Sequence, residues 1–356
     1  MNKKIIFTLI IITFLTTGCW NYNELNSLAI TTSIAIDKKK DKYEVSILIA
    51  NSQNKQSTSE DGQSQTVVYS ALGDTLSDAL KNIDLENPRQ TYVGHLSSII
   101  ISEDVAKEGL INILDLLLRN SESTKRFYIA IARGDKAKDI VKIVSPLEAF
   151  PAQTISTNIK SSSESQAVSS AVVYSDFIDK MIKTGVEPIL PTITIEGKIK
   201  GGSKNSNLEQ SEPKASLKLD TIAAFKKDKL IEYASKNESR GINLALDKIE
   251  SMIIKYKCKK NYLVAEIKNV KSNIKVDVKK DINVLINLKT NGDIIENSCD
   301  LDLTDVNVID KINKDVEKKI KKLVPFVPWC SFDMLAILVT IARFMMELSR
   351  LSSFMW

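Results

Sequence analysis

Cys19 is the residue whose type and position point most directly to chemistry. Two lysines open the chain, an apolar stretch covers residues 5–15, and Thr17-Gly18 places small residues directly before the cysteine. This order is typical of an export signal. In bacterial lipoproteins a cysteine at this place accepts diacylglycerol on its sulfur, and a peptidase then cuts on its amino side. The sequence therefore predicts a lipoprotein signal peptide over residues 1–18 and lipidation of Cys19.

The signal departs from the usual pattern, because Leu15 lies at minus four and Thr16 occupies the minus-three place. A cleavable signal followed by a chance cysteine is the alternative. Lipidation is the preferred hypothesis, since diacylglycerol and palmitate chains contribute about 0.8 kcal/mol per buried CH₂ and two chains anchor a protein firmly. The apolar stretch is shorter than the roughly 20 residues that cross a bilayer. We expect the mature chain to sit on the outer face of a membrane without crossing it.

The other three cysteines are Cys258, Cys299 and Cys330. None lies in a C-x-x-C pair, and the chain has a single histidine, so a zinc site is not supported. Outside the cytoplasm a disulfide between Cys258 and Cys299 can form. Two free thiols are the alternative, and the spacing does not decide between them.

His95 is the only histidine of the chain and the candidate for a general base. It stands in Gly94-His95-Leu96-Ser97-Ser98, but the chain contains no G-x-S-x-G elbow, and acidic residues are spread evenly. Phosphate-binding glycine motifs are absent too. A structural histidine is therefore the default interpretation, and a secreted hydrolase the distant alternative. The residues predict no catalytic site, no cofactor and no metal.

Composition bounds the class of protein. The chain has 356 residues, 43% hydrophobic and 26% charged, which suffices for two or three globular domains. A net charge of +5 on a mixed surface argues against a nucleic-acid partner. Arg119 and the runs Lys226–Lys229 and Lys318–Lys322 could bind anions or lipid head groups. Helix-dipole contacts and solvated faces are the alternative for all three.

The hydrophobic pattern divides the chain into two regions. Residues 19–200 alternate strand and helix patterns, whereas residues 217–322 are mostly strands followed by an amphipathic helix. The polar stretch 201–216, with Leu208 as its one large apolar side chain, is the expected linker. The predicted fold class is α+β: a mixed sheet with helices, then a mainly antiparallel sheet domain with a long amphipathic helix.

Local patterns place the elements. The expected strands are 28–36, 43–49, 66–71, 96–101, 127–131, 192–200, 217–225, 230–233, 251–256, 262–267, 274–278 and 282–288. Helices are expected after the caps Thr75 and Ser102, the second running on to Arg119 and forming a strand-helix-strand crossover, and at 135–144, 173–181 and 309–323. Residues 51–65 predict an exposed loop, 160–170 a Ser-rich linker, and Asn291-Gly292 a turn.

The order of these features resembles one known family. The segments that carry the resemblance are Gly18-Cys19-Trp20-Asn21-Tyr22-Asn23-Glu24-Leu25, Leu28-Ala29-Ile30, Ile34-Ala35-Ile36-Asp37, Gly73-Asp74-Thr75-Leu76, Gly94-His95-Leu96, Leu118-Arg119, Pro188 to Pro191 and Ala223-Ala224-Phe225-Lys226-Lys227-Asp228-Lys229-Leu230. Together they are similar to the Ger(x)C family, also called GerAC, the C subunits of spore nutrient-germinant receptors. The resemblance covers residues 1 to about 322.

This resemblance implies a lipoprotein of α+β build at the outer face of the spore inner membrane. It implies two membrane-embedded partners, an A and a B subunit, in a complex that responds to small nutrients and triggers germination. No catalytic residue is carried over, and Cys19 alone transfers as a site. Whether this subunit contacts the nutrient stays open. The alternative is an extracytoplasmic substrate-binding or envelope-assembly lipoprotein.

The tail 323–356 departs from the rest of the chain. It holds four of the seven Met and two of the three Trp, and it contains no Lys. This shift predicts translation in a wrong reading frame or a truncated gene. A genuine interfacial helix at Met334 to Met346 is the alternative, since that stretch is too short to span a bilayer.

Overall fold

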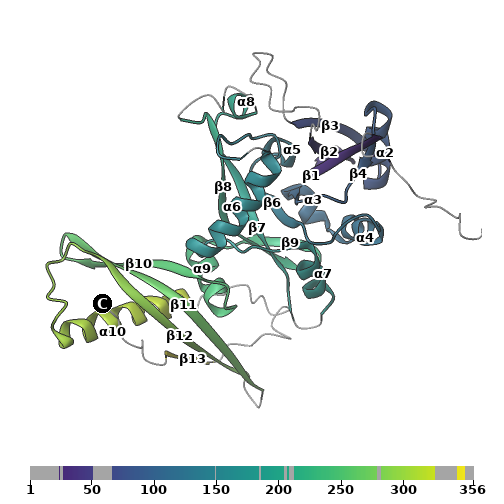
Figure 1. The fold of residues 1–356 in the computed structure, drawn as a ribbon. Helices are drawn as coiled ribbons and strands as arrows, with labels where there is room; N and C mark the ends of the chain where they lie inside the picture. Colours follow the sequence, from purple (N-terminus) through teal and green to yellow (C-terminus); the bar gives the residue numbers. More distant parts are fainter. Residues whose placement is uncertain are drawn as a thin grey trace, which may run out of the picture.

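A computed structural model describes residues 24, 27–50, 66–148, 150–183, 186–203, 207, 212–278 and 282–324, together with the backbone of 343–348. Cys19, Cys330 and the expected loop 51–65 lie outside the described residues. Two β-sheets organise the described part of the chain, and Figure 1 shows them at opposite ends of the molecule with helix α9 (Lys236–Ala245) between them. The fold class is α+β, as predicted.

Within the described ranges, the larger sheet has nine strands in the order β3-β2-β1-β5-β6-β7-β8-β9, with β4 paired to β1. Strands β1, β5, β6 and β7 run parallel, and the remaining neighbours along this order are antiparallel. Their bounds are β1 Leu28–Lys39, β2 Lys42–Ala50, β3 Thr66–Gly73, β4 Gln90–Tyr92, β5 Ser98–Ser102, β6 Tyr128–Ala132, β7 Ile189–Gly197, β8 Ala215–Lys226 and β9 Lys229–Tyr233. The sheet is therefore mixed, and the predicted crossover from β5 to β6 is confirmed.

Helices cover both faces of the larger sheet because apolar side chains alternate along its central strands. Ile34 and Ile36 of β1 pack in the cluster that holds α2 (Leu76–Glu86), α3 (Glu103–Glu108), α4 (Ile111–Arg119) and α7 (Tyr174–Ile182). The intervening Ala35 packs in the opposite cluster with α5 (Ala137–Ile140) and α6 (Pro151–Ser165). The core of this region thus consists of two apolar layers with the sheet between them.

The second sheet contains three antiparallel strands, β10 (Ser251–Cys258), β11 (Asn261–Val278) and β12 (Ile282–Asn297). Helix α10 (Val306–Leu323) packs on it through the predicted stripe, with Ile312, Val316 and Ile320 buried. Of the tail, the structure describes only the backbone of β13 (Arg343–Leu348), which runs parallel to β12. The expected reading-frame change in the tail stays a prediction.

The single helix expected from Ser102 to Arg119 is divided into α3 and α4. Gly109 ends α3 with a φ of +127°, a backbone conformation that glycine tolerates and other residues rarely adopt. Leu110 and Ile111 then donate their amides to Asp228, which lies in the turn between β8 and β9. A partner far along the sequence therefore caps the second helix.

The Ser-rich segment expected as a linker over 160–170 begins inside helix α6. Its serines satisfy their hydroxyls on the backbone one turn earlier, as Ser161 does on Thr157 and Ser165 on Ser161. Ile155 and Ile159 face the core of the larger sheet. Burial of this stripe outweighs the low helix propensity of serine.

Two further segments pair differently from expectation. The hairpin of β8 and β9, placed with the second region on sequence grounds, pairs with β7 in the larger sheet. Asn291 and Gly292 do not form a turn, because they lie within β12 opposite Lys268 and Ile267. The irregularity falls on the partner strand instead, where Asn269 has a φ of +51°.

The segment expected as a linker over 201–216 begins inside the short helix α8 (Ile199–Gly202) and contains a buried asparagine. Asn207 Nδ2 donates to the carbonyl oxygens of Val144 and Ala215 at 2.9 and 3.1 Å. Its Oδ1 accepts from the amide of Lys214 at 2.6 Å. This side chain therefore attaches the segment to the larger sheet.

Candidate functional site

Cys19, the predicted lipidation site, lies outside the described residues. His95 lies in the turn before β5, where its exposed ring packs edge-on against Tyr92 with centroids 6.0 Å apart. No described serine, threonine or carboxylate forms a hydrogen bond with the His95 ring. The structure therefore does not bring a hydrolase triad together around this histidine.

The carboxyl ends of parallel strands are a common place for ligands, and charged residues lie at this edge of the larger sheet. Asp37, near the end of β1, is buried, and its two oxygens accept from the amides of Ala137 and Lys138 at 2.9 and 2.8 Å. Burial raises the pKa of this carboxyl, while the two amide hydrogen bonds act in the opposite direction. Asp37 thus binds the start of α5, a structural role.

Arg133, which follows β6 at the same edge, is also fully engaged. Its Nη1 donates to Asp220 Oδ2 at 2.7 Å and to Thr221 Oγ1 at 3.0 Å, and its guanidinium lies 4.5 Å from the centre of the Tyr233 ring. Burial raises the pKa of Tyr233, and the nearby Glu103 adds to that shift. Arg133 is thus held by a carboxylate, a hydroxyl and an aromatic ring, which is a structural arrangement. The buried hydroxyl of Tyr233 has no hydrogen-bond partner among the described residues, and its raised pKa keeps it protonated.

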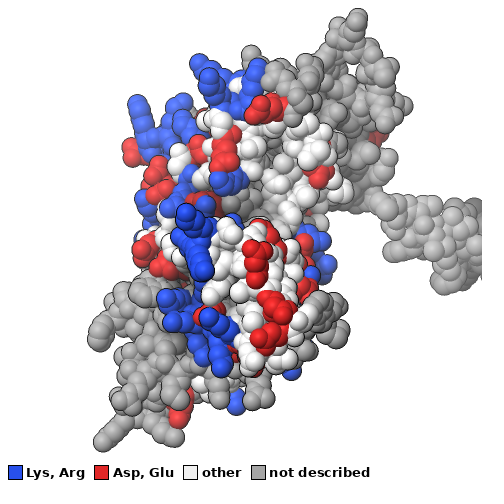
Figure 2. All heavy atoms as spheres, turned by 90° about the vertical axis from the view of Figure 1, so that its left-hand side faces the viewer, with Lys and Arg blue, Asp and Glu red and all other residues white. Residues whose placement is uncertain are grey.

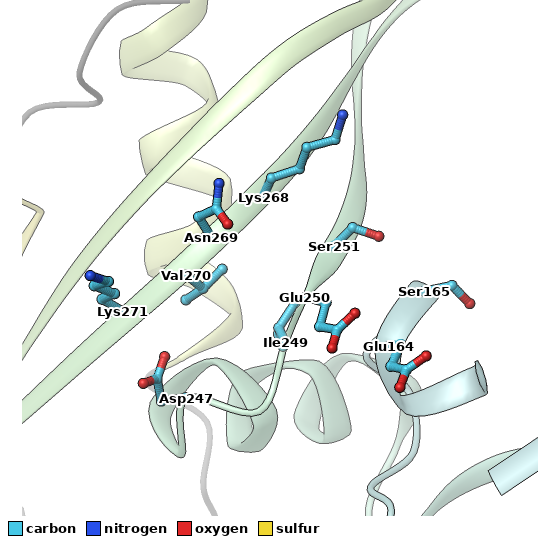
Figure 3. Close-up of a pocket in the computed structure, with 10 residues that line it drawn as sticks. All are labelled: Glu164, Ser165, Asp247, Ile249, Glu250, Ser251, Lys268, Asn269, Val270 and Lys271. Carbon is cyan, nitrogen blue, oxygen red and sulfur yellow. The ribbon is translucent and has the colours of Figure 1, made fainter. Parts of the chain in front are cut away.

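A groove of about 760 Å³ lies where the end of α6 meets the loop after α9 and strands β10 and β11. Figure 3 shows the Glu250 carboxylate turned toward Glu164 of α6, with the ammonium groups of Lys268 and Lys271 pointing away from both. Lys268 Nζ lies 2.8 Å from Glu266 and 3.0 Å from Asp293. The groove is polar, open and of mixed charge, which suits surface contact better than bond-making chemistry.

The junction beside this groove is built on α9. Ser239 Oγ accepts from the amide of Ile222 in β8 at 3.2 Å, and Asn243 Nδ2 donates to the carbonyl oxygens of Ala167 and Ser169, both at 2.8 Å. Gly241 lies against the Leu323 carbonyl at the end of α10. Helix α9 therefore connects the larger sheet, the segment after α6 and the second sheet.

Cys258 and Cys299 form a disulfide in the structure, with Cα atoms 5.9 Å apart. Of the two alternatives left open by the sequence, the disulfide is the one observed. Within the described ranges, no three His, Cys, Asp or Glu residues converge as metal ligands. The helices of those same ranges include none with the length and apolarity needed to cross a bilayer.

Sequence reasoning missed the polar residues that hold the fold together. Arg119, named from the sequence, ends α4 and pairs with Asp115 of the same helix at 2.7 Å, which fits the helix-end interpretation. In the run Lys226–Lys229 the important group is Asp228, which caps α4. Asp37 and Asn243 bind backbone amides and carbonyls of segments distant in sequence. A buried Asp or Asn in an otherwise apolar pattern was the available signal, as in Ile34-Ala35-Ile36-Asp37.

Comparison with known families assigns this two-sheet architecture. Residues 21–195 match the model described as spore germination protein N-terminal domain. Residues 220–326 match the model described as spore germination B3/GerAC like, C-terminal. The fold and the matched regions thus define a two-part spore germination protein. The chain belongs to the GerAC family, the family of germinant-receptor C subunits.

Two curated relatives agree with this membership. The chain is 28% identical over 331 residues to "Putative spore germination protein YfkR" of Bacillus subtilis (strain 168), covering 90% of this chain and 82% of the relative. It is 28% identical over 244 residues to spore germination protein KC of the same strain, covering 67% of this chain and 60% of that protein. The crystal structure of the GerBC protein matches with a TM-score of 0.42 and 17% identity, over 82% of this chain and 80% of the other.

Proposed function

We propose that the chain is the lipid-anchored, non-catalytic C subunit of a nutrient-germinant receptor. In this proposal it sits on the outer face of the spore inner membrane and acts by assembly with membrane-embedded A and B subunits. One observation carries the proposal: both GerAC family models match in order across residues 21–326, directly after Cys19.

The position of β1 supports anchoring through Cys19. The first strand begins at Leu28, and the segment from Cys19 to Leu28 spans at most about 30 Å when fully extended. Acylation of Cys19 would therefore hold the larger sheet close to the bilayer surface. The disulfide between Cys258 and Cys299 also fits a compartment outside the cytoplasm, where disulfides persist.

The engagement of the polar groups supports a role in assembly. Asp37, Arg133 and Asp228 each bind other parts of the chain, as described above. These contacts stabilise the fold and leave surfaces, such as the groove beside α9, for contact with partners.

Co-purification tests the proposal. An affinity-tagged chain is isolated from detergent-solubilised spore membranes, and the accompanying proteins are identified by mass spectrometry. Two polytopic membrane proteins in a fixed ratio to the chain are expected. A folded chain that comes from the same membranes alone, or with soluble proteins only, would contradict the proposal.

A further inference from the structure

A second cleft lies on the other side of α9, between that helix, strand β10 and the end of α10. Its volume is about 700 Å³. Four of its ten lining residues are cationic, and none is acidic. The polar residues that line it are Arg240, Lys255, Lys319, Lys322, Asn237 and Gln166. In contrast to the mixed groove, the polar side chains of this cleft are cations and amides, with no carboxylate.

Arg240 supplies the most specific observation. Its Nε is buried and has no hydrogen-bond partner in the structure. Leaving a buried donor unpaired costs about 1–3 kcal/mol, and more when the group is charged. Its neighbours Ser239 and Gly241 are fixed against β8 and α10, so the backbone that carries Arg240 is held firmly. The side chain that lines the cleft therefore carries a donor for which the described residues supply no acceptor.

Nearby carboxylates do not neutralise the cleft. Glu238 is used in the capping box of α9, where its Oε2 accepts from the amide of Ser235 at 2.7 Å. Asp315 of α10 interacts with the hydroxyl of Tyr256. Lys319 donates to the backbone carbonyl of Lys255, which keeps its ammonium group at the cleft. None of the four lining cations forms an ion pair with a described carboxylate.

Figure 2 shows that Lys and Arg side chains are numerous along one side of this face, with Asp and Glu side chains among them. The excess of positive charge is therefore a property of the cleft itself, whose lining has four cationic residues and no acidic one. A local excess of one sign attracts ions of the opposite sign.

We propose that this cleft binds a phosphate group. The guanidinium fork of Arg240 matches two phosphate oxygens, and the lysine ammonium groups supply further charge. Met252, Ile253 and Leu323 line the remaining wall, so a small organic group attached to the phosphate has an apolar surface to contact. The ligand class is a free phosphate, a small organic phosphate or a phospholipid head group, which share this chemistry.

The arrangement of the molecule favours a soluble source over the bilayer. Figure 1 shows α9, one wall of the cleft, between the two sheets, with β10 and α10 beyond it and β1 on the far side of the larger sheet. If Cys19 anchors the chain next to β1, the cleft lies away from the membrane surface. This choice between sources rests on the proposed function, whereas the phosphate site itself does not.

Titration of the full-length chain in detergent with inorganic phosphate tests the site by calorimetry at low ionic strength. Lys322→Gln removes a lining charge from an exposed position, and Lys321→Gln is the matched control, because Lys321 is the neighbouring exposed lysine of α10 outside the cleft. We expect Lys322→Gln to weaken phosphate binding about tenfold and Lys321→Gln to change it by less than about twofold. Arg240→Gln is expected to weaken binding further, with folding checked by circular dichroism.

An experiment with lipid vesicles distinguishes a phospholipid head group from a soluble phosphate as the ligand. Flotation with phosphatidylglycerol vesicles, against phosphatidylcholine vesicles, is measured with the Cys19→Ala chain so that no acyl chain contributes. Binding to the anionic vesicles that Lys322→Gln abolishes assigns the phosphate to a lipid head group, and its absence assigns it to a soluble molecule. Equal weakening of phosphate binding by Lys321→Gln and Lys322→Gln, or no phosphate binding at about 10 mM, would overturn the proposal.

Discussion

Asp228 caps a helix that begins 117 residues earlier in the chain: the amide of Ile111 donates to Asp228 Oδ2 at 3.1 Å. The amide of Leu110 donates to the carbonyl oxygen of the same residue at 3.0 Å. Gly109 makes this possible, since an added Cβ would lie 2.6 Å from Asp228 Oδ2. The edge of the larger sheet is thereby joined to the break between α3 and α4.

Replacement of Asp228 tests this capping contact. Asp228→Ala leaves the Ile111 amide without its side-chain acceptor, and we expect the free energy of unfolding to fall by about 1 kcal/mol. Chemical denaturation followed by circular dichroism measures the change. Asp41→Ala, in the turn between β1 and β2, is the matched control and is expected to change stability by less than about 0.5 kcal/mol. Equal effects from both substitutions would show that the cap contributes nothing.

Gly241→Ala tests the packing of α9 on α10. The added methyl group would overlap the carbonyl oxygen of Leu323, so the two helices must separate. We expect a loss of about 1–3 kcal/mol in the free energy of unfolding. Alanine otherwise favours a helix over glycine by about 1 kcal/mol, so a stabilised variant would contradict the close contact seen at this position.

The disulfide between Cys258 and Cys299 closes β10 to the end of β12 over a sequence separation of 41 residues. Replacing both cysteines with serine is expected to lower the free energy of unfolding by roughly 3–4 kcal/mol, because the unfolded chain regains the entropy of the open loop. Cys330→Ser serves as the control, with little expected change. Two free thiols at Cys258 and Cys299 in the purified, unreduced protein would refute the pairing.

The buried Asp37 carboxyl is expected to make the protein less stable as the pH rises. Its folded-state pKa is raised above the usual 3.8 by burial, with Glu44 and Asp139 adding to the shift and the amides of Ala137 and Lys138 opposing it. The folded state therefore holds this proton more tightly than the unfolded state. The resulting stability is fully present below pH 3.8 and is lost as the pH rises through the folded-state pKa.

Urea unfolding at a series of pH values, starting below pH 3.8 and rising, measures whether Asp37 causes this loss of stability. Asp37→Asn removes the titrating group, so the decline that it causes is expected to disappear. Asp139→Asn, which removes a neighbouring carboxylate with no comparable burial, is expected to keep the decline. If Asp37→Asn has the same pH profile as the unmodified chain, another group is responsible.

Local signals predicted the elements that depend on neighbours in sequence. The side chain of Thr75 caps α2 by accepting from the amide of Asp78 at 3.1 Å, as its position before an apolar helix pattern predicts. The apolar stripe of α10 and the crossover from β5 to β6 also follow from periodicity alone. These patterns carry their own physical cause, so they survive in the folded chain.

Features that depend on distant contacts could not be predicted in the same way. The break at Gly109 depends on Asp228, and the helix over the Ser-rich segment depends on burial of Ile155 and Ile159. The lysine run Lys318–Lys322 was identified as a charged segment, but only the packing of α9 on α10 separates Lys319 and Lys322, in the cleft, from Lys321 outside it. The site emerges from tertiary structure and not from the run itself.

The most direct measurement of the central claim is nutrient-triggered germination of spores that lack this gene, followed by the fall in optical density. Restoring the unmodified chain is expected to restore the response, and restoring Cys19→Ala is expected to restore it poorly, because the chain loses its membrane anchor. Loss of the nutrient response with normal vegetative growth is the predicted result for the deletion. A normal nutrient response in the deletion spores would contradict a role as a germinant-receptor subunit.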